Sequence, residues 1–179
     1  METVFLIGYS GCGKSVIGKL LAARKNKNFI NTNEYIEKKE DSSILEIYEK
    51  KGETYFRNLE KYVLDNVDLN DSIVSLGSGI ANDYSNLLKI KQKGKTIFLR
   101  ATAETLYNNL KEDFIVKPYI KDNYNAQYIN ELYNKNINSY YELSNYVIDV
   151  DNKSINDIFS ETLFYYNKIN KITCKIFIM

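Results

Sequence analysis

Residues 8–15, GYSGCGKS, decide the fold of this 179-residue chain. They match the pattern G-x4-G-K-[ST], with a short apolar run before them at 4–7 and a helix-periodic segment after them at 16–23. A strand, a glycine-rich loop and a helix form the context in which this pattern binds nucleotide phosphates. Backbone N–H groups and the helix N-terminus then hold the phosphate oxygens. The stretch therefore predicts a site for ATP or GTP.

Each residue type in the loop has a physical role in such a site. The lysine, Lys14, reaches the terminal phosphates, and the Ser15 hydroxyl faces Mg²⁺. We interpret Cys12 as a small filler, because no neighbouring base would activate its thiol. The predicted nucleotide site comprises Gly8, Ser10, Gly11, Cys12, Gly13, Lys14, Ser15 and Val16.

Further β-like runs occur at residues 29–30, 72–76, 95–99 and 146–149, and helix-periodic segments separate them. Continuous apolar strands that alternate with helices indicate a parallel sheet covered on both faces. The expected fold is therefore a three-layer α/β domain with a five-stranded sheet. In the helix predicted at 55–67, we expect Tyr55, Leu59, Tyr62 and Val63 to face the core.

Composition excludes several classes of protein. The 24 basic and 23 acidic residues leave a net charge of +1, so we expect no nucleic-acid partner, and no window is apolar enough for a membrane span. We expect a cytoplasmic protein. The chain has no histidine, so its chemistry must use Asp, Glu, Lys, Arg and bound Mg²⁺. Residues 111–125 combine charges with the lone Pro118 and form a candidate mobile flap.

Seven stretches, in chain order, resemble shikimate kinases: FLIGYSGCGKSVIGKLLA, FINTNEYIE, ETYFRNLE, VSLGSGIA, KTIFLRATAETL, the lone KP and YYELSNYVIDV. The resemblance covers residues 3–157. It implies a P-loop kinase of the nucleoside-monophosphate-kinase type, with an acceptor-binding helical segment and a lid. Such an enzyme transfers the γ-phosphoryl group of ATP, with Mg²⁺, to the 3-hydroxyl of shikimate in aromatic amino-acid biosynthesis. We assign residues 1–168 to this domain, expect a monomer, and leave 169–179 as a tail of unknown role that could form an edge strand or an exposed segment.

The resemblance also implies roles for residues outside the loop. Arg57 matches the arginine that pairs with the acceptor's carboxylate, and Glu60 matches its companion one turn along. Gly77, Ser78 and Gly79 match a triple glycine that approaches the acceptor, with serine in place of the middle glycine.

Other positions depart from the family's pattern. Asn31 and Asn33 stand where the family has aspartates, the first near the magnesium water shell and the second at the acceptor's hydroxyls. Lys117 replaces the lid arginine, and Asn136 replaces a second carboxylate-binding arginine. The adjacent Lys135 is rotated about 100° around a helix, so we do not assume that it substitutes. The implied catalytic residues are Lys14, Asn33 and Lys117; the substrate residues are Asn33, Arg57, Gly77, Ser78, Gly79 and Asn136; the metal residues are Ser15 and Asn31.

Alternatives remain at this point. Arg57 could form only a surface ion pair with Glu60, Asn31 and Asn33 could serve only as turn and cap residues, and Lys117 could be a solvated loop charge. At the level of function, the chain could phosphorylate a different hydroxylated acceptor, or it could bind nucleotide without turnover.

Overall fold

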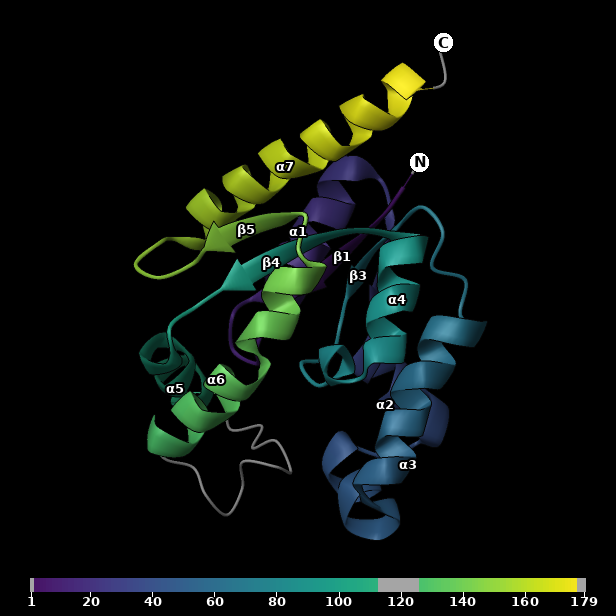
Figure 1. The fold of residues 1–179 in the computed structure, drawn as a ribbon, viewed down its shortest axis with the longest axis vertical. Coiled ribbons are helices and arrows are strands. Elements are labelled where there is room, and N and C mark those ends of the chain that lie inside the picture. The colour runs from purple at the N-terminus through teal and green to yellow at the C-terminus, as the bar shows by residue number, and fades with distance from the viewer. Residues whose placement is uncertain (1, 113–125, 177–179) are drawn as a thin grey trace.

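The computed structural model describes residues 2–112 and 126–176, and of residues 111, 112, 126, 136 and 171–176 it describes the backbone. Five parallel strands form one sheet in the order β2-β3-β1-β4-β5 (Figure 1). Their bounds are β1 Thr3–Ile7, β2 Asn28–Asn31, β3 Ser72–Ser75, β4 Gly94–Arg100 and β5 Tyr146–Asp149. The expected five-stranded parallel sheet is confirmed.

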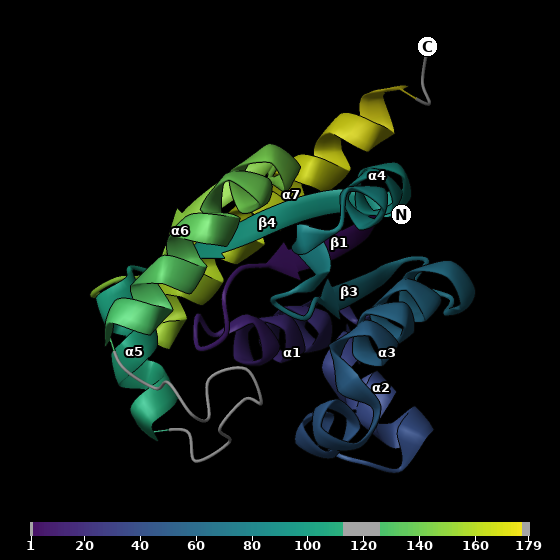
Figure 2. The same cartoon turned by 60° about the horizontal axis from the view of Figure 1, so that its bottom comes forward.

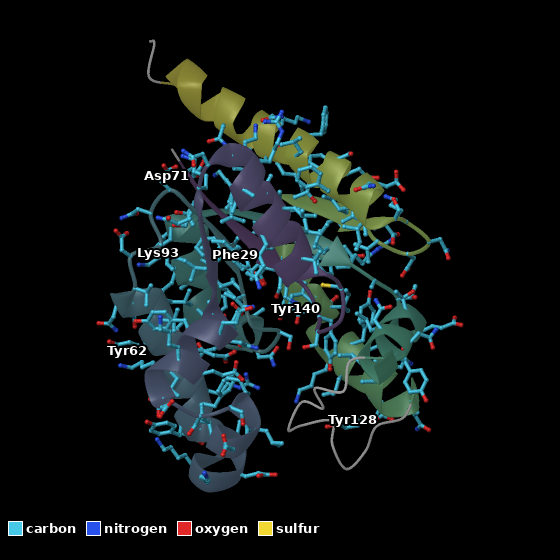
Figure 3. The ribbon with its side chains drawn as sticks, turned by 180° about the vertical axis from the view of Figure 1, so that it is seen from behind. Phe29, Tyr62, Asp71, Lys93, Tyr128 and Tyr140 are labelled. Atoms are coloured by element: carbon cyan, nitrogen blue, oxygen red, sulfur yellow. The ribbon has the colours of Figure 1, made fainter. Side chains whose placement is uncertain are left out.

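Helices cover both faces of this sheet. They are α1 Lys14–Lys25, α2 Thr32–Glu40, α3 Ile44–Asn66, the 3₁₀ helix η1 Ile80–Asn82, α4 Tyr84–Lys93, α5 Ala103–Glu112, α6 Ala126–Leu143 and α7 Ile155–Ile176. The helices α1 and α7 pack on one face, in front in Figure 3, and α4 and α6 pack on the other. This three-layer arrangement buries every residue of β1, as expected for a central strand without polar alternation.

The helices α2 and α3 form a separate group beside the edge strand β2, with their own small apolar core (Figure 1). A capping box between Ser43 and Glu46 begins α3, and Gly52, at φ 80°, bends it. After the bend the buried face comprises Phe56, Leu59, Glu60, Val63 and Leu64.

That buried face corrects the expected stripe of α3. Leu59 and Val63 are buried as predicted, but Tyr55 and Tyr62 are 37% and 38% exposed. Tyr55 and Tyr62 lie on the outer side of α3, because the side of the helix that faces the core is the one that carries Phe56 and Glu60. The glutamate is only 1% exposed, which apolar periodicity could not predict.

The end of the chain also differs from expectation. An edge strand beyond residue 169 is wrong, because α7 continues as one helix to Ile176. Its buried residues Ile158, Thr162, Tyr166 and Ile169 follow helical spacing, so the stripe that holds α7 against the domain extends past the proposed start of the tail. None of the described helices has the length and apolar composition of a membrane-spanning segment.

Candidate active site

The loop between β1 and α1 lies at the carboxyl end of the central strand, with α2 and α3 on one side and α5 and α6 on the other (Figure 2). Gly8 has φ 140°, and a Cβ there would lie 2.5 Å from the Leu99 carbonyl oxygen, so this turn requires glycine. The loop thus passes close to β4 and ends at Lys14, the first residue of α1.

The side chain of Lys14 is folded against the loop. Its Nζ donates to the carbonyl oxygens of Gly8, at 2.8 Å, and Tyr9, at 2.7 Å, and the residue is 9% exposed. Cys12 is also buried, with Sγ 3.8 Å from the same ammonium. A buried, packed thiol agrees with the expected filler role. The ammonium is a positive charge located where the loop's N–H groups would gather phosphates.

Asn31 connects the loop to α2 through both ends of its amide. Its Oδ1 accepts from the backbone N–H groups of Asn33, at 3.0 Å, and Glu34, at 3.4 Å, so it caps α2. Its Nδ2 donates to Ser15 Oγ and to Glu34 Oε1, both at 3.0 Å. The cap interpretation of Asn31 is therefore correct, and the same side chain also lies beside the hydroxyl expected to face a metal.

The segment after β3 contacts the loop through Ser78. The hydroxyls of Ser10 and Ser78 lie 3.1 Å apart in the interior. The Ser78 carbonyl accepts from Tyr140 Oη at 2.5 Å, and Tyr140, labelled in Figure 3, is buried on α6. Next to it, the Gly77 N–H donates to Thr32 Oγ1 at 2.9 Å. These contacts fix the segment relative to α1, α2 and α6.

Arg57 lies against Gly79, where a Cβ would overlap the guanidinium, so this glycine allows the close approach. Its Nη1 donates to Glu60 Oε2 at 2.8 Å, and its Nη2 donates to Glu53 Oε1 at 3.0 Å. Partial burial alone would lower the pKa of Arg57, but the Glu60 and Glu53 carboxylates outweigh it and raise that pKa. The expected ion pair exists, but its acidic partner is buried and is not a surface residue.

Asn33 completes the acceptor side. Its Oδ1 is buried and has no hydrogen-bond partner among the residues that the structure describes. A Cβ at Gly77 would lie 2.7 Å from this oxygen and 2.9 Å from Glu60 Oε1, so both oxygens face the same glycine. The cap alternative is wrong for Asn33, because Asn31 is the cap residue and Asn33 lies within α2; its acceptor atom points toward the segment that also contacts Arg57.

Two cavities flank these residues. One, of about 480 Å³, borders Gly11, Cys12, Gly13 and Val16 of the loop, together with residues of α5 and of the β5–α7 connection. The other, of about 630 Å³, is lined by Arg57 and Gly79, by Glu53, Lys61 and Asp83, and by Lys135 and Ser139 of α6. The first suits a nucleotide base and sugar beside the phosphate loop, and the second suits a small acceptor.

The structure brings most of the predicted residues to the carboxyl ends of β1, β2 and β3. Lys117 and Pro118 lie outside the described residues, and of Asn136 the structure describes the backbone. Sequence reasoning missed Asn109, whose Nδ2 donates to the Gly11 carbonyl at 2.8 Å, and it set Lys135 aside. No local motif marks Asn109, because the contact spans 98 positions of the chain.

Comparisons with known proteins agree with this geometry. Residues 10–166 match the family model described as shikimate kinase. A shikimate kinase of Persephonella marina is 35% identical over 164 residues, which cover 91% of this chain and 98% of that protein. The crystal structure of a shikimate kinase from Aquifex aeolicus matches with a TM-score of 0.78 at 30% identity, covering 92% of this chain and 95% of that one. A shikimate kinase from Acinetobacter baumannii, solved in complex with shikimate, has a TM-score of 0.88 at 24% identity over 94% of each chain, which shows the shared fold.

Proposed function

Because the chain belongs to the shikimate kinase family, we infer that it transfers the γ-phosphoryl group of ATP to the 3-hydroxyl of shikimate. The observation that carries this inference is the family match across residues 10–166, which includes residues 10–15 of the phosphate loop, Arg57 and the segment after β3. In the reaction, the bond from the γ-phosphorus to its bridging oxygen breaks. A bond to the acceptor oxygen forms, and the hydroxyl proton is released. Neither a different acceptor nor a module without turnover is favoured by the comparisons.

On the nucleotide side, we assign phosphate binding to the loop residues predicted from sequence. Lys14 would leave the Gly8 and Tyr9 carbonyls and neutralise charge on the terminal phosphates. Because those carbonyls are its present partners, the move exchanges neutral acceptors for anionic ones and adds the attraction between opposite charges. The cavity beside Val16 and Asn109 would take the base and sugar.

Mg²⁺ fits the donor set at the start of α1. Ser15 supplies a hydroxyl and Glu34 a carboxylate, and Asn31 Nδ2 donates to both of these oxygen groups and so holds them near each other. Oxygen ligands of this kind, completed by phosphates and water, suit Mg²⁺. When bound, the ion would screen the charge of the terminal phosphates.

On the acceptor side, Arg57 would pair with the carboxylate of shikimate, and Gly79 would admit the guanidinium to the site. Asn33 Oδ1 would accept a hydrogen bond from an acceptor hydroxyl beside Gly77 and Ser78. An amide cannot accept the proton itself. Phosphoryl transfer depends mainly on positioning and electrostatics, so an orienting group is sufficient at this position. All of these residues come from one chain, and we propose that the protein acts as a monomer.

The test is ADP release from Mg²⁺-ATP, measured by a coupled assay with and without millimolar shikimate. We expect turnover that depends on shikimate and is strongly reduced in Lys14→Ala and Arg57→Ala. A wild-type protein that binds ATP but shows no stimulation by shikimate would contradict the proposed function.

A further inference from the structure

We propose that Lys135, on α6, acts together with Arg57 in holding the acceptor's carboxylate and so determines specificity for an anionic acceptor. The inference rests on the proposed function and deepens it. Lys135 lines the same cavity as Arg57 and Gly79, although its helical rotation relative to Asn136 had argued against such a role. In the structure, the face of α6 that carries Lys135 borders the acceptor cavity.

The charges around Arg57 show why a second cation is needed. Its guanidinium donates to Glu60 at 2.8 Å and to Glu53 at 3.0 Å, so one positive charge faces two carboxylates. This group of three has a net charge of −1. A carboxylate that approached it would meet net repulsion at short range, because like charges close together disfavour ionised forms. Arg57 therefore offers hydrogen-bond donors to a carboxylate, but the group formed by Arg57, Glu53 and Glu60 lacks the net positive charge that would attract one.

The other lysine in the cavity wall is already paired. Lys61 Nζ lies 2.6 Å from Asp83 Oδ2, and the two form a neutral pair. Lys135 has no ion pair with any residue that the structure describes, and its side chain is exposed to the cavity. Adding the charge of Lys135 to those of Arg57, Glu53 and Glu60 brings this group to neutrality. Lys135 is therefore the cation available to an incoming carboxylate.

The backbone of α6 is held in a suitable place. Tyr140 Oη donates to the Ser78 carbonyl at 2.5 Å, which fixes the helix against the segment that precedes Gly79. Lys135 and Ser139 are four residues apart, on one face of α6, and both line the cavity. A lysine has a flexible four-carbon stem and a compact charge, so it can follow a carboxylate without the fixed fork of an arginine.

The experiment compares shikimate with its carboxamide, in which the negative charge is absent and the ring hydroxyls are kept. For Lys135→Met we expect the KM for shikimate and its calorimetric dissociation constant to rise about tenfold, with kcat and the KM for ATP within about twofold of wild type. The KM for the carboxamide should not change. Lys135→Arg should restore shikimate binding to near the wild-type value. Lys93→Met, at the end of α4, is the matched control and should leave all constants unchanged.

The outcomes separate this inference from the proposed function. An unchanged KM for shikimate in Lys135→Met overturns the inference, and so does an equal rise for shikimate and carboxamide, which would indicate a purely structural effect. If the wild-type protein does not phosphorylate shikimate at all, the proposed function itself fails, and the inference fails with it.

Discussion

The hydroxyls of Ser10 and Ser78 lie 3.1 Å apart, and this buried contact joins the phosphate loop to the segment after β3. Ser78 occupies the position where the shikimate kinase pattern has a middle glycine. Its side chain points toward the loop, where Ser10 provides a partner, and its carbonyl accepts from Tyr140. The Ser78 hydroxyl therefore connects the phosphate loop with the segment after β3.

Removing this hydroxyl should destabilise the protein. In Ser78→Ala, Ser10 loses a buried partner, and we expect the free energy of unfolding to fall by about 1 kcal/mol. Urea denaturation followed by circular dichroism measures the change. Ser160→Ala is the control, because that exposed hydroxyl donates to the Asn156 carbonyl of its own helix and should matter by less than about 0.5 kcal/mol. Wild-type stability in Ser78→Ala would show that the contact contributes nothing.

Lys14→Ala should abolish most turnover while leaving the fold intact. The ammonium is the positive charge placed by the loop, and losing a group that stabilises transition-state charge typically reduces kcat by about 10²- to 10³-fold. Steady-state ADP release at saturating shikimate measures the effect. Lys19→Ala, on the next turns of α1, removes an exposed lysine paired with Glu34 and should retain kcat within about threefold. Comparable kcat values for the two variants would contradict the role of Lys14.

The fold was predictable from sequence because its signals are local. The strands β1, β3, β4 and β5 are short apolar runs, and the phosphate loop follows one of them directly. Alternating strands and helices then specify a parallel sheet. The loop residues of the site were predictable for the same reason, since their positions depend on one continuous motif.

The remaining features depend on contacts that the pattern does not contain. Glu60 is buried because Arg57 pairs with it, so the face of α3 is set by a charge and not by apolar spacing. The alternation after residue 169 is polar enough to suggest a strand, yet the buried stripe of α7 continues through Ile169. Lys135 borders the cavity beside Arg57 because of the rotation of α6, the helix on which Tyr140 is buried and donates to the Ser78 carbonyl.

Asn31 should contribute to stability through its cap. Its Oδ1 accepts from two backbone N–H groups of α2, and replacing a capping asparagine by alanine costs about 0.5–2 kcal/mol. We therefore expect Asn31→Ala to lower the free energy of unfolding by about 1 kcal/mol in urea titrations. Asn31→Ser retains a capping oxygen and should lose less. If both variants are as stable as the wild-type protein, the cap does not contribute to folding.

Asp83 should make the stability of the protein depend on acidic pH. Its carboxylate accepts from Lys61 Nζ, at 2.6 Å, and from both the hydroxyl and the backbone N–H of Ser85, and the Lys61 contact is the main cause that lowers the Asp83 pKa. Because this pKa is lower in the folded state, the unfolded chain takes up the proton first as the pH falls through the ordinary value of 3.8. The stabilisation is therefore complete above about pH 5 and decreases progressively as the pH falls through 3.8 toward the lowered pKa of the folded state. Asp83→Asn keeps an oxygen for Ser85 but loses the charge, so the free energy of unfolding should fall less steeply over this interval. Lys61→Met should flatten the same slope, and a wild-type slope in Asp83→Asn would show that other carboxylates carry the acid sensitivity.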